Sequence, residues 1–170
     1  MSRDRNFTRK TDFFIETGSY YGDGIQLALN SGFDKIYSIE LSKDLYNHCV
    51  SRFSNFGKVE ILLGDSSIKL KEILEKNPNV PFTYWLDGHY SGGVTARGEK
   101  DCPLKEELEC ILSRDIEGEL IYIDDMRHYR NHEDIDLEYI KNLINKYKPK
   151  AKYWFEESNL DEKDQMVIEY

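Results

Sequence analysis

Short apolar runs alternate with amphipathic stretches along the 170 residues of the chain. Seven runs have the length and composition of strands: 12–17, 35–41, 58–65, 81–87, 118–125, 151–157 and 165–170. Five segments between the runs have the apolar spacing of helices: 22–32, 42–53, 66–76, 103–114 and 133–147. The last two strands are joined by a short connection, which predicts a hairpin at the end of the chain.

Strands that alternate with helices of 10–15 residues are typical of βαβ units. The pattern therefore predicts an α/β fold with a doubly wound, Rossmann-like, mostly parallel sheet. The length fits one domain that covers 1–170. In such a fold, ligands bind at the carboxyl ends of the strands, so the residues at these ends are the first candidates for function.

Acidic residues stand at the carboxyl ends of the first five predicted strands: Glu16, Glu40, Asp65, Asp87, and the pair Asp124 and Asp125. Like charges that converge on one edge of a sheet repel one another. We therefore expect a cationic or hydroxyl-rich ligand at this edge.

The first turn, "ETGSYYGDG", places glycines at 18, 22 and 24 between a strand and a helix. This GxxxGxG spacing differs from the GxGxxG pattern that binds a pyrophosphate. Glu16 before the turn suits an ammonium group, and Glu40 at the end of the second strand suits the two hydroxyls of a ribose. Asp65 is placed for an adenine amino group. A ligand with these three parts and no phosphate is S-adenosylmethionine (SAM).

At these residues the sequence resembles the class I SAM-dependent methyltransferases. The resemblance rests on "FIETGSYYGDG", "YSIEL" and "LLGDSS" and covers nearly the whole chain in element order. It implies a seven-stranded sheet whose last strand is antiparallel. It also implies a set of SAM-binding residues: Glu16, Gly18, Ser19, Gly22, Gly24, Glu40, Leu41, Asp65, Ser66 and Asp87.

The pattern "LDG…IDD" resembles the metal-dependent O-methyltransferases of the catechol type and of the sugar-modifying macrocin and novobiocin type. In these families, acids at the matching positions hold Mg²⁺, which implies Asp87, Asp124 and Asp125 as metal ligands here. Carboxylates are the oxygen ligands that Mg²⁺ prefers. For the acid pair alone, a helix N-cap or a solvated turn is the alternative.

Asp87 and His89 are the catalytic candidates. His89 lies two residues after Asp87, where sugar-modifying relatives place a base, and a neutral imidazole can accept a hydroxyl proton near pH 7. His128 and His132, which follow the fifth strand, compete for this role. The glycine-containing loop 90–103 is expected to act as a lid, and an open acceptor site favours a sugar or a glycosylated molecule over an enclosed catechol.

The net charge of −9 argues against a broad nucleic-acid surface. The sequence has neither an apolar run of roughly 20 residues nor a signal-peptide pattern, so no membrane span and a cytoplasmic location are expected. Three cysteines without a CxxC pair indicate neither a zinc ribbon nor a disulfide framework.

Three other functions stay open at this point: a nicotinamide-dependent oxidoreductase, a non-catalytic nucleotide-binding module, and a nucleic-acid or protein N-methyltransferase. The glycine spacing argues against the first, and the retained acids argue against the second. The third usually carries [DN]PP[YF], which this sequence lacks. The sequence leaves the oligomeric state open, a homodimer included.

Overall fold

The computed structural model describes residues 7, 9–87, 103–130, 135–157 and 160–170. Its strands are Phe13–Thr17 (β1), Lys35–Glu40 (β2), Val59–Leu63 (β3), Phe82–Leu86 (β4), Leu120–Ile123 (β5), Lys152–Glu156 (β6) and Gln165–Glu169 (β7). Its α-helices are Asp23–Asn30 (α1), Lys43–Arg52 (α2), Ser66–Lys76 (α3), Leu104–Leu112 (α4) and Leu137–Tyr147 (α5). A 3-10 helix, Met126–Tyr129 (η1), follows β5.

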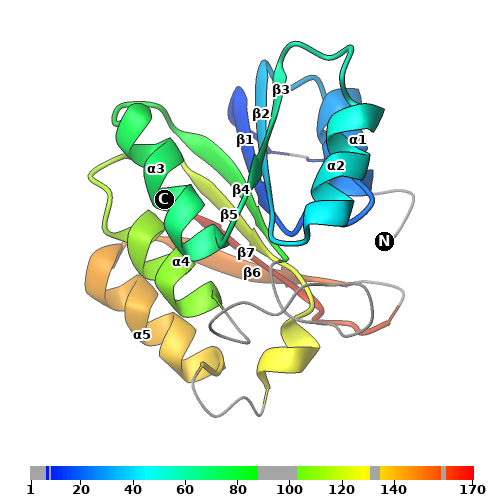
Figure 1. The fold of residues 1–170 in the computed structure, drawn as a ribbon. Helices are drawn as coiled ribbons and strands as arrows, with labels where there is room; N and C mark the ends of the chain where they lie inside the picture. Colours follow the sequence, from blue (N-terminus) through cyan, green and yellow to red (C-terminus); the bar gives the residue numbers. More distant parts are fainter. Residues whose placement is uncertain (1–6, 8, 88–102, 131–134, 158–159) are drawn as a thin grey trace.

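The strands form one sheet in the order β3-β2-β1-β4-β5-β7-β6 (Figure 1). The first five strands pair in parallel, and β7 is antiparallel to both β5 and β6. Strand β7 is therefore the one that runs against the others. The predicted doubly wound sheet with an antiparallel C-terminal strand is confirmed.

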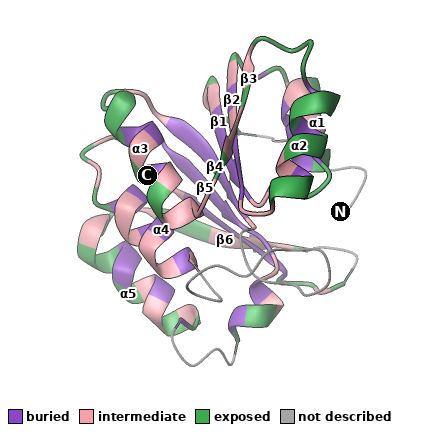
Figure 2. Ribbon diagram, viewed as in Figure 1, coloured by how far each residue is buried: buried purple, intermediate pink, exposed green. Residues whose placement is uncertain are grey.

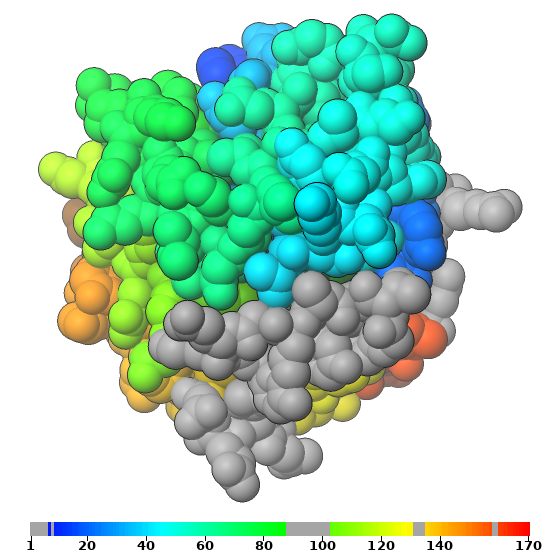
Figure 3. All heavy atoms as spheres, in the orientation of Figure 1, coloured from blue at the N-terminus to red at the C-terminus, as the bar shows by residue number. Residues whose placement is uncertain are grey.

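Helices cover both faces of the sheet, and the alternation of side chains along each strand explains why. Phe14 of β1 packs in a core with Ile25 of α1 on one face. Its neighbour Ile15 points to the opposite face, into a larger core that includes Leu108 of α4 and Ile140 of α5. The central strands are accordingly buried between two helical layers (Figure 2). On the face shown in Figure 3, the side chains of α2, β3 and α3 form a continuous surface.

Several elements are shorter than the sequence pattern predicts, and backbone conformation gives the reason. The helix expected at 22–32 is limited by Gly22 and Gly32, which have left-handed φ angles of 87° and 74°. The strand expected at 118–125 lies between Gly118 and Asp125, whose φ angles are also positive. The helices in the described part of the chain are too short and too polar to cross a lipid bilayer.

Candidate functional site

The carboxyl ends of the parallel strands lie side by side, because hydrogen bonds continue past the strands. The backbone N–H of Asp87 donates to the carbonyl of Thr17 at 3.2 Å, which ties the end of β4 to the end of β1. The N–H of Asp124 donates to the carbonyl of Leu86 at 3.1 Å, which ties β5 to β4 in the same way. The structure therefore gathers the predicted acids along one edge.

The turn after β1 needs its glycines. Gly18 and Gly22 have φ angles of 83° and 87°, a region that side chains with a Cβ rarely adopt. A Cβ on Gly22 would also lie 2.4 Å from Cε2 of Phe53, so α2 packs directly against the turn. Tyr20 adopts a left-handed φ of 49° without being glycine. Such a conformation persists only where the surroundings hold it, and this is a common feature of ligand-binding loops.

Gly24 brings the start of α1 against the carboxylate that ends β1. A Cβ at Gly24 would lie 1.6 Å from Oε1 of Glu16. The first turn of α1 and the Glu16 side chain therefore fit together only because residue 24 has no side chain. Two of the residues predicted to bind SAM, Glu16 and Gly24, are therefore packed directly against each other.

Glu16 is a buried acid whose charge is disfavoured. Burial raises the pKa of its carboxyl to about 8, although the hydrogen bond that Ser38 Oγ donates at 2.7 Å lowers it, and the nearby charges of Asp87 and Glu40 raise it further. The hydroxyl of Ser19 lies 2.5 Å from that of Ser38 and extends this polar group. A buried acid of this kind ionises readily only when a cation arrives beside it.

Glu40 fixes the turn from the neighbouring strand. Its Oε2 accepts the N–H of Tyr20 at 2.9 Å, and its Oε1 accepts the N–H of Ser42 at 2.8 Å. The side chain is 6% exposed. Each oxygen uses one lone pair in these bonds and keeps the capacity to accept a second donor. Two oxygens held in this way match the two adjacent hydroxyls of a ribose.

Asp65, which the sequence predicts to bind the adenine amino group, also has a structural role. As the N-cap of α3, it accepts the N–H and the hydroxyl of Ser67 at Oδ1, at 2.9 and 2.6 Å. Ser66 is the first residue of the helix, and Leu41 lies half-buried after β2. The cap leaves Oδ2 of Asp65 for a ligand, so the two roles are compatible.

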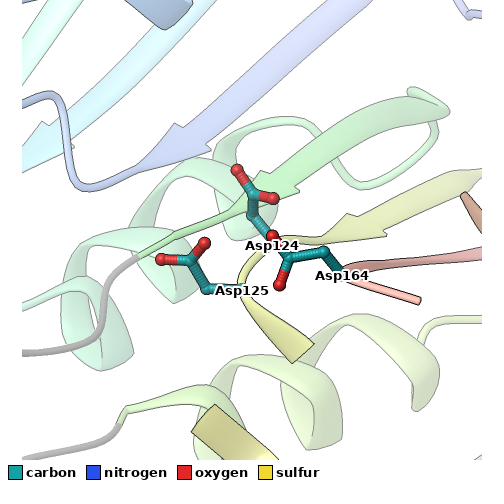
Figure 4. A group of neighbouring side chains, drawn as sticks. All are labelled: Asp124, Asp125 and Asp164. Carbon is teal, nitrogen blue, oxygen red and sulfur yellow. The ribbon is translucent and has the colours of Figure 1, made fainter. Parts of the chain in front are cut away.

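Three carboxylates meet where β5 ends and β7 begins. Asp124, Asp125 and Asp164 each offer an oxygen, and these oxygens lie within 4.8 Å of one another (Figure 4). We call these three residues the acidic corner. Among the described residues, this is the group that could hold a metal ion, and Asp87 is not part of it. Its oxygens are the ligand type of Mg²⁺ or Ca²⁺.

A guanidinium links two members of the acidic corner. Nη1 of Arg127 donates to Oδ1 of Asp125 at 2.6 Å and to Oδ2 of Asp164 at 2.5 Å. Asp125 has a left-handed backbone with φ 56° and is the N-cap of η1, the 3-10 helix that contains Arg127. His128, one of the base candidates, is half-exposed, with its Nε2 4.0 Å from Oδ2 of Asp125.

The other base candidates, His89 and His132, lie outside the described residues, as does nearly all of the expected lid at 90–103. Their roles stay predictions from the sequence. The described part of the edge therefore contains the acidic corner and residues predicted to bind SAM, among them Glu16, Glu40 and Asp65.

Sequence reasoning missed two acids. Asp164 is buried at the start of β7, and nothing in the local pattern distinguishes it from other acids of that loop. Glu107 is buried in the first turn of α4, and its burial raises its pKa to about 7, although the nearby hydroxyls of Ser66 and Thr17 lower it. The spacing could have revealed Glu107, because it lies three residues after Leu104 on the buried face of the helix.

Comparison with protein-family models gave no match, and neither did a search of curated proteins. Solved structures do match. An O-methyltransferase from Bacillus cereus in complex with S-adenosylhomocysteine (SAH) has a TM-score of 0.62 at 15% identity, over 93% of this chain and 73% of that one. A protein from Staphylococcus aureus described as a caffeoyl-CoA O-methyltransferase has a TM-score of 0.60 at 13% identity, over 94% and 77%. One from Clostridium thermocellum described as an rRNA methylase has 0.58 at 13%, over 95% and 89%.

At these identities the comparisons establish the fold alone. The Staphylococcus aureus and Clostridium thermocellum proteins are described with different acceptors, which shows how little the fold says about the substrate. The strand order, the reversed β7 and these matches agree with the resemblance seen in the sequence. The chain therefore has the fold of the class I SAM-dependent methyltransferases.

Proposed function

We propose that the protein is a SAM-dependent O-methyltransferase that moves a methyl group to a hydroxyl of a sugar or glycosylated acceptor. The observation that carries this proposal is the series of acids along the edge, Glu16, Glu40 and Asp65, around a glycine turn in a methyltransferase fold. Their chemistry matches an ammonium, a ribose and an adenine in that order.

Each acid has a distinct task in the proposed complex. The Glu16 carboxyl would ionise against the α-ammonium of SAM, since a cation beside a buried acid lowers its pKa. Glu40 would accept from the ribose hydroxyls while it holds the N–H of Tyr20. Asp65 would accept from the adenine amino group through the oxygen that the helix cap leaves over.

We also propose a divalent ion for the other half of the edge. Asp124 and Asp125 supply oxygens from the end of β5, and Asp87 follows β4 next to them. We infer that these three residues would hold Mg²⁺, which when bound would orient two acceptor oxygens and lower the pKa of the attacking hydroxyl. His89 would then take the hydroxyl proton, with His128 and His132 as the alternatives.

The charge of the chain supports a small or glycan acceptor. With a net charge of −9, the protein would repel the phosphates of a nucleic acid. The likeness to a protein described as an rRNA methylase concerns the fold only, at 13% identity. RNA is nevertheless included among the acceptors assayed below, because the result distinguishes a glycan acceptor from a nucleic-acid acceptor.

The proposal is tested by transfer of a labelled methyl group from SAM. The purified protein is assayed with a panel of glycosides, catechols and RNA, in Mg²⁺ and in EDTA. We expect label in a hydroxyl-bearing glycoside in the presence of Mg²⁺ and none in EDTA. Transfer to RNA alone would reject the acceptor class, and full turnover in EDTA would reject the metal. Absence of transfer to every class would contradict the enzymatic proposal.

A further inference from the structure

The turn after β1 contains a strained residue that both β2 and α2 hold. Tyr20 has a left-handed φ of 49°. Its N–H donates to Oε2 of Glu40, the last residue of β2, at 2.9 Å. Its carbonyl accepts a hydrogen bond from Sγ of Cys49, on α2, at 3.2 Å. The peptide groups on both sides of Tyr20 are therefore bonded to other elements, which is how a residue other than glycine keeps such a conformation.

Arg52 of α2 holds the next carbonyl of the same turn. Its Nη1 donates to the carbonyl oxygen of Tyr21 at 2.5 Å and to Oδ1 of Asp23, the first residue of α1, at 3.1 Å. One guanidinium nitrogen therefore joins the turn to the helix that follows it. We call the contacts that Cys49 and Arg52 make with the turn the α2 clasp.

Helical spacing brings both donors of the α2 clasp to the turn. Cys49 and Arg52 are three residues apart, so they lie on one face of α2. Phe53 is four residues after Cys49, and its ring lies where a Cβ of Gly22 would be. Burial, with a smaller contribution from nearby carboxylates, raises the pKa of the Cys49 thiol to about 12, so the thiol keeps the proton that it donates.

The two acceptors of Arg52 contribute unequally. Asp23 is 67% exposed, and an ion pair with an exposed carboxylate adds little to stability. The bond to the Tyr21 carbonyl has a charged donor, which makes it stronger than a bond between neutral groups, and its acceptor belongs to the turn itself. Helix α2 is also anchored independently, by its buried Leu45. Loss of the Arg52 guanidinium should therefore loosen the turn more than it destabilises the whole protein.

We propose that Arg52 is a positioning residue for the cofactor, which sets the affinity for SAM by holding the turn after β1 in the shape that SAM binds. Arg52 acts through the carbonyl of Tyr21 and not through contact with SAM, and Cys49 supports the neighbouring carbonyl in the same way. This inference rests on the SAM-binding role in the proposed function. It adds that cofactor affinity depends on α2, none of whose residues the sequence predicts to bind SAM.

Two measurements on Arg52→Gln and Arg52→Lys test this proposal. Amide hydrogen exchange followed by NMR, without any ligand, reports how readily the turn opens at the bonded N–H groups of Tyr20 and Gly22. Calorimetry then gives the affinity for SAH. Thermal melting of the same samples separates a local effect on the turn from a loss of overall stability.

We expect faster exchange at both amides in Arg52→Gln and about tenfold weaker SAH binding, the loss expected for one hydrogen bond to a charged group. The melting temperature should stay close to that of the wild type. Arg52→Lys should lie between the two, because it keeps the charge but loses the planar fork. The matched control is Lys35→Gln, which breaks an ion pair with Glu60 at the start of β2 and should leave both readouts unchanged.

Unchanged SAH affinity or unchanged exchange in Arg52→Gln would overturn the proposal, as would an equal loss of affinity in Lys35→Gln. If the wild type binds SAH and the Arg52 variants bind it equally well, the positioning role alone is refuted. If the wild type binds no SAH, the proposed function fails, and the role of Arg52 in cofactor affinity fails with it. If Arg52→Gln does not fold, Arg52→Lys carries the test, and wild-type affinity in that variant would overturn the proposal.

Discussion

Replacement of Glu16 by glutamine should remove a loss of apoprotein stability that grows as the pH rises, and it should weaken cofactor binding. Burial raises the pKa of Glu16 from an ordinary 4.5 to about 8. Between these values the folded state holds a proton that the unfolded state has lost, so stability falls as pH rises. At about 1.4 kcal/mol per pH unit, the loss amounts to about 3 kcal/mol between pH 5.5 and pH 8.

Glutamine keeps the shape of the side chain and cannot ionise, so this pH-dependent loss disappears in Glu16→Gln. Urea unfolding of both proteins at several pH values gives the difference in their free energies of unfolding. The amide has its own constant cost in the buried site, but that cost does not change with pH. We expect the difference to shift by about 3 kcal/mol in favour of Glu16→Gln from pH 5.5 to pH 8.

The control is Glu60→Gln on β3, whose side chain is 50% exposed. A difference between wild type and Glu16→Gln that stays constant with pH would refute the assigned effect of burial. Cofactor binding gives a second readout. An ammonium beside Glu16 should draw off its proton, so SAH binding at pH 7 should release a proton in the wild type and not in Glu16→Gln.

Three further variants probe the edge. Glu40→Ala should weaken SAH binding by about 1.5–3 kcal/mol, the value of hydrogen bonds to a charged group, and unchanged affinity in calorimetry would remove the ribose assignment. Gly24→Ala should lower the melting temperature and SAH affinity, because its Cβ would collide with Glu16, whereas Gly57→Ala, with no atom within 4 Å of its Cβ, should not affect SAH binding. His89→Ala should still bind SAH and Mn²⁺ but lose about 10²–10⁴ in kcat, and near wild-type turnover would move the base elsewhere.

Much of the fold could be predicted because apolar spacing and glycine turns are local signals. Strand and helix order follow from the alternation, and the acids at the strand ends follow from the strand order. The ends of elements were less predictable. Strand β5 ends before Asp125 because that residue adopts a left-handed backbone, and the sequence pattern does not predict this conformation.

The site was less accessible to sequence reasoning where it depends on contacts between distant segments. Asp164 joins Asp125 only because β7 inserts beside β5, and the choice of partner for Arg127 depends on that insertion. The tight fit of Gly24 on Glu16 likewise arises from the packing of α1 on the sheet. Spacing could nominate Glu16 and Gly24, but not the contact between them.

The most direct test of the central claim is calorimetric titration of the purified protein with SAH, in parallel with NAD⁺, in the absence of added metal. The account predicts saturable binding of one SAH per chain and no binding of NAD⁺, because the turn after β1 pairs an acid with its glycines instead of offering a pyrophosphate site. Binding of NAD⁺ in preference to SAH, or no heat with SAH at millimolar concentration, would contradict it.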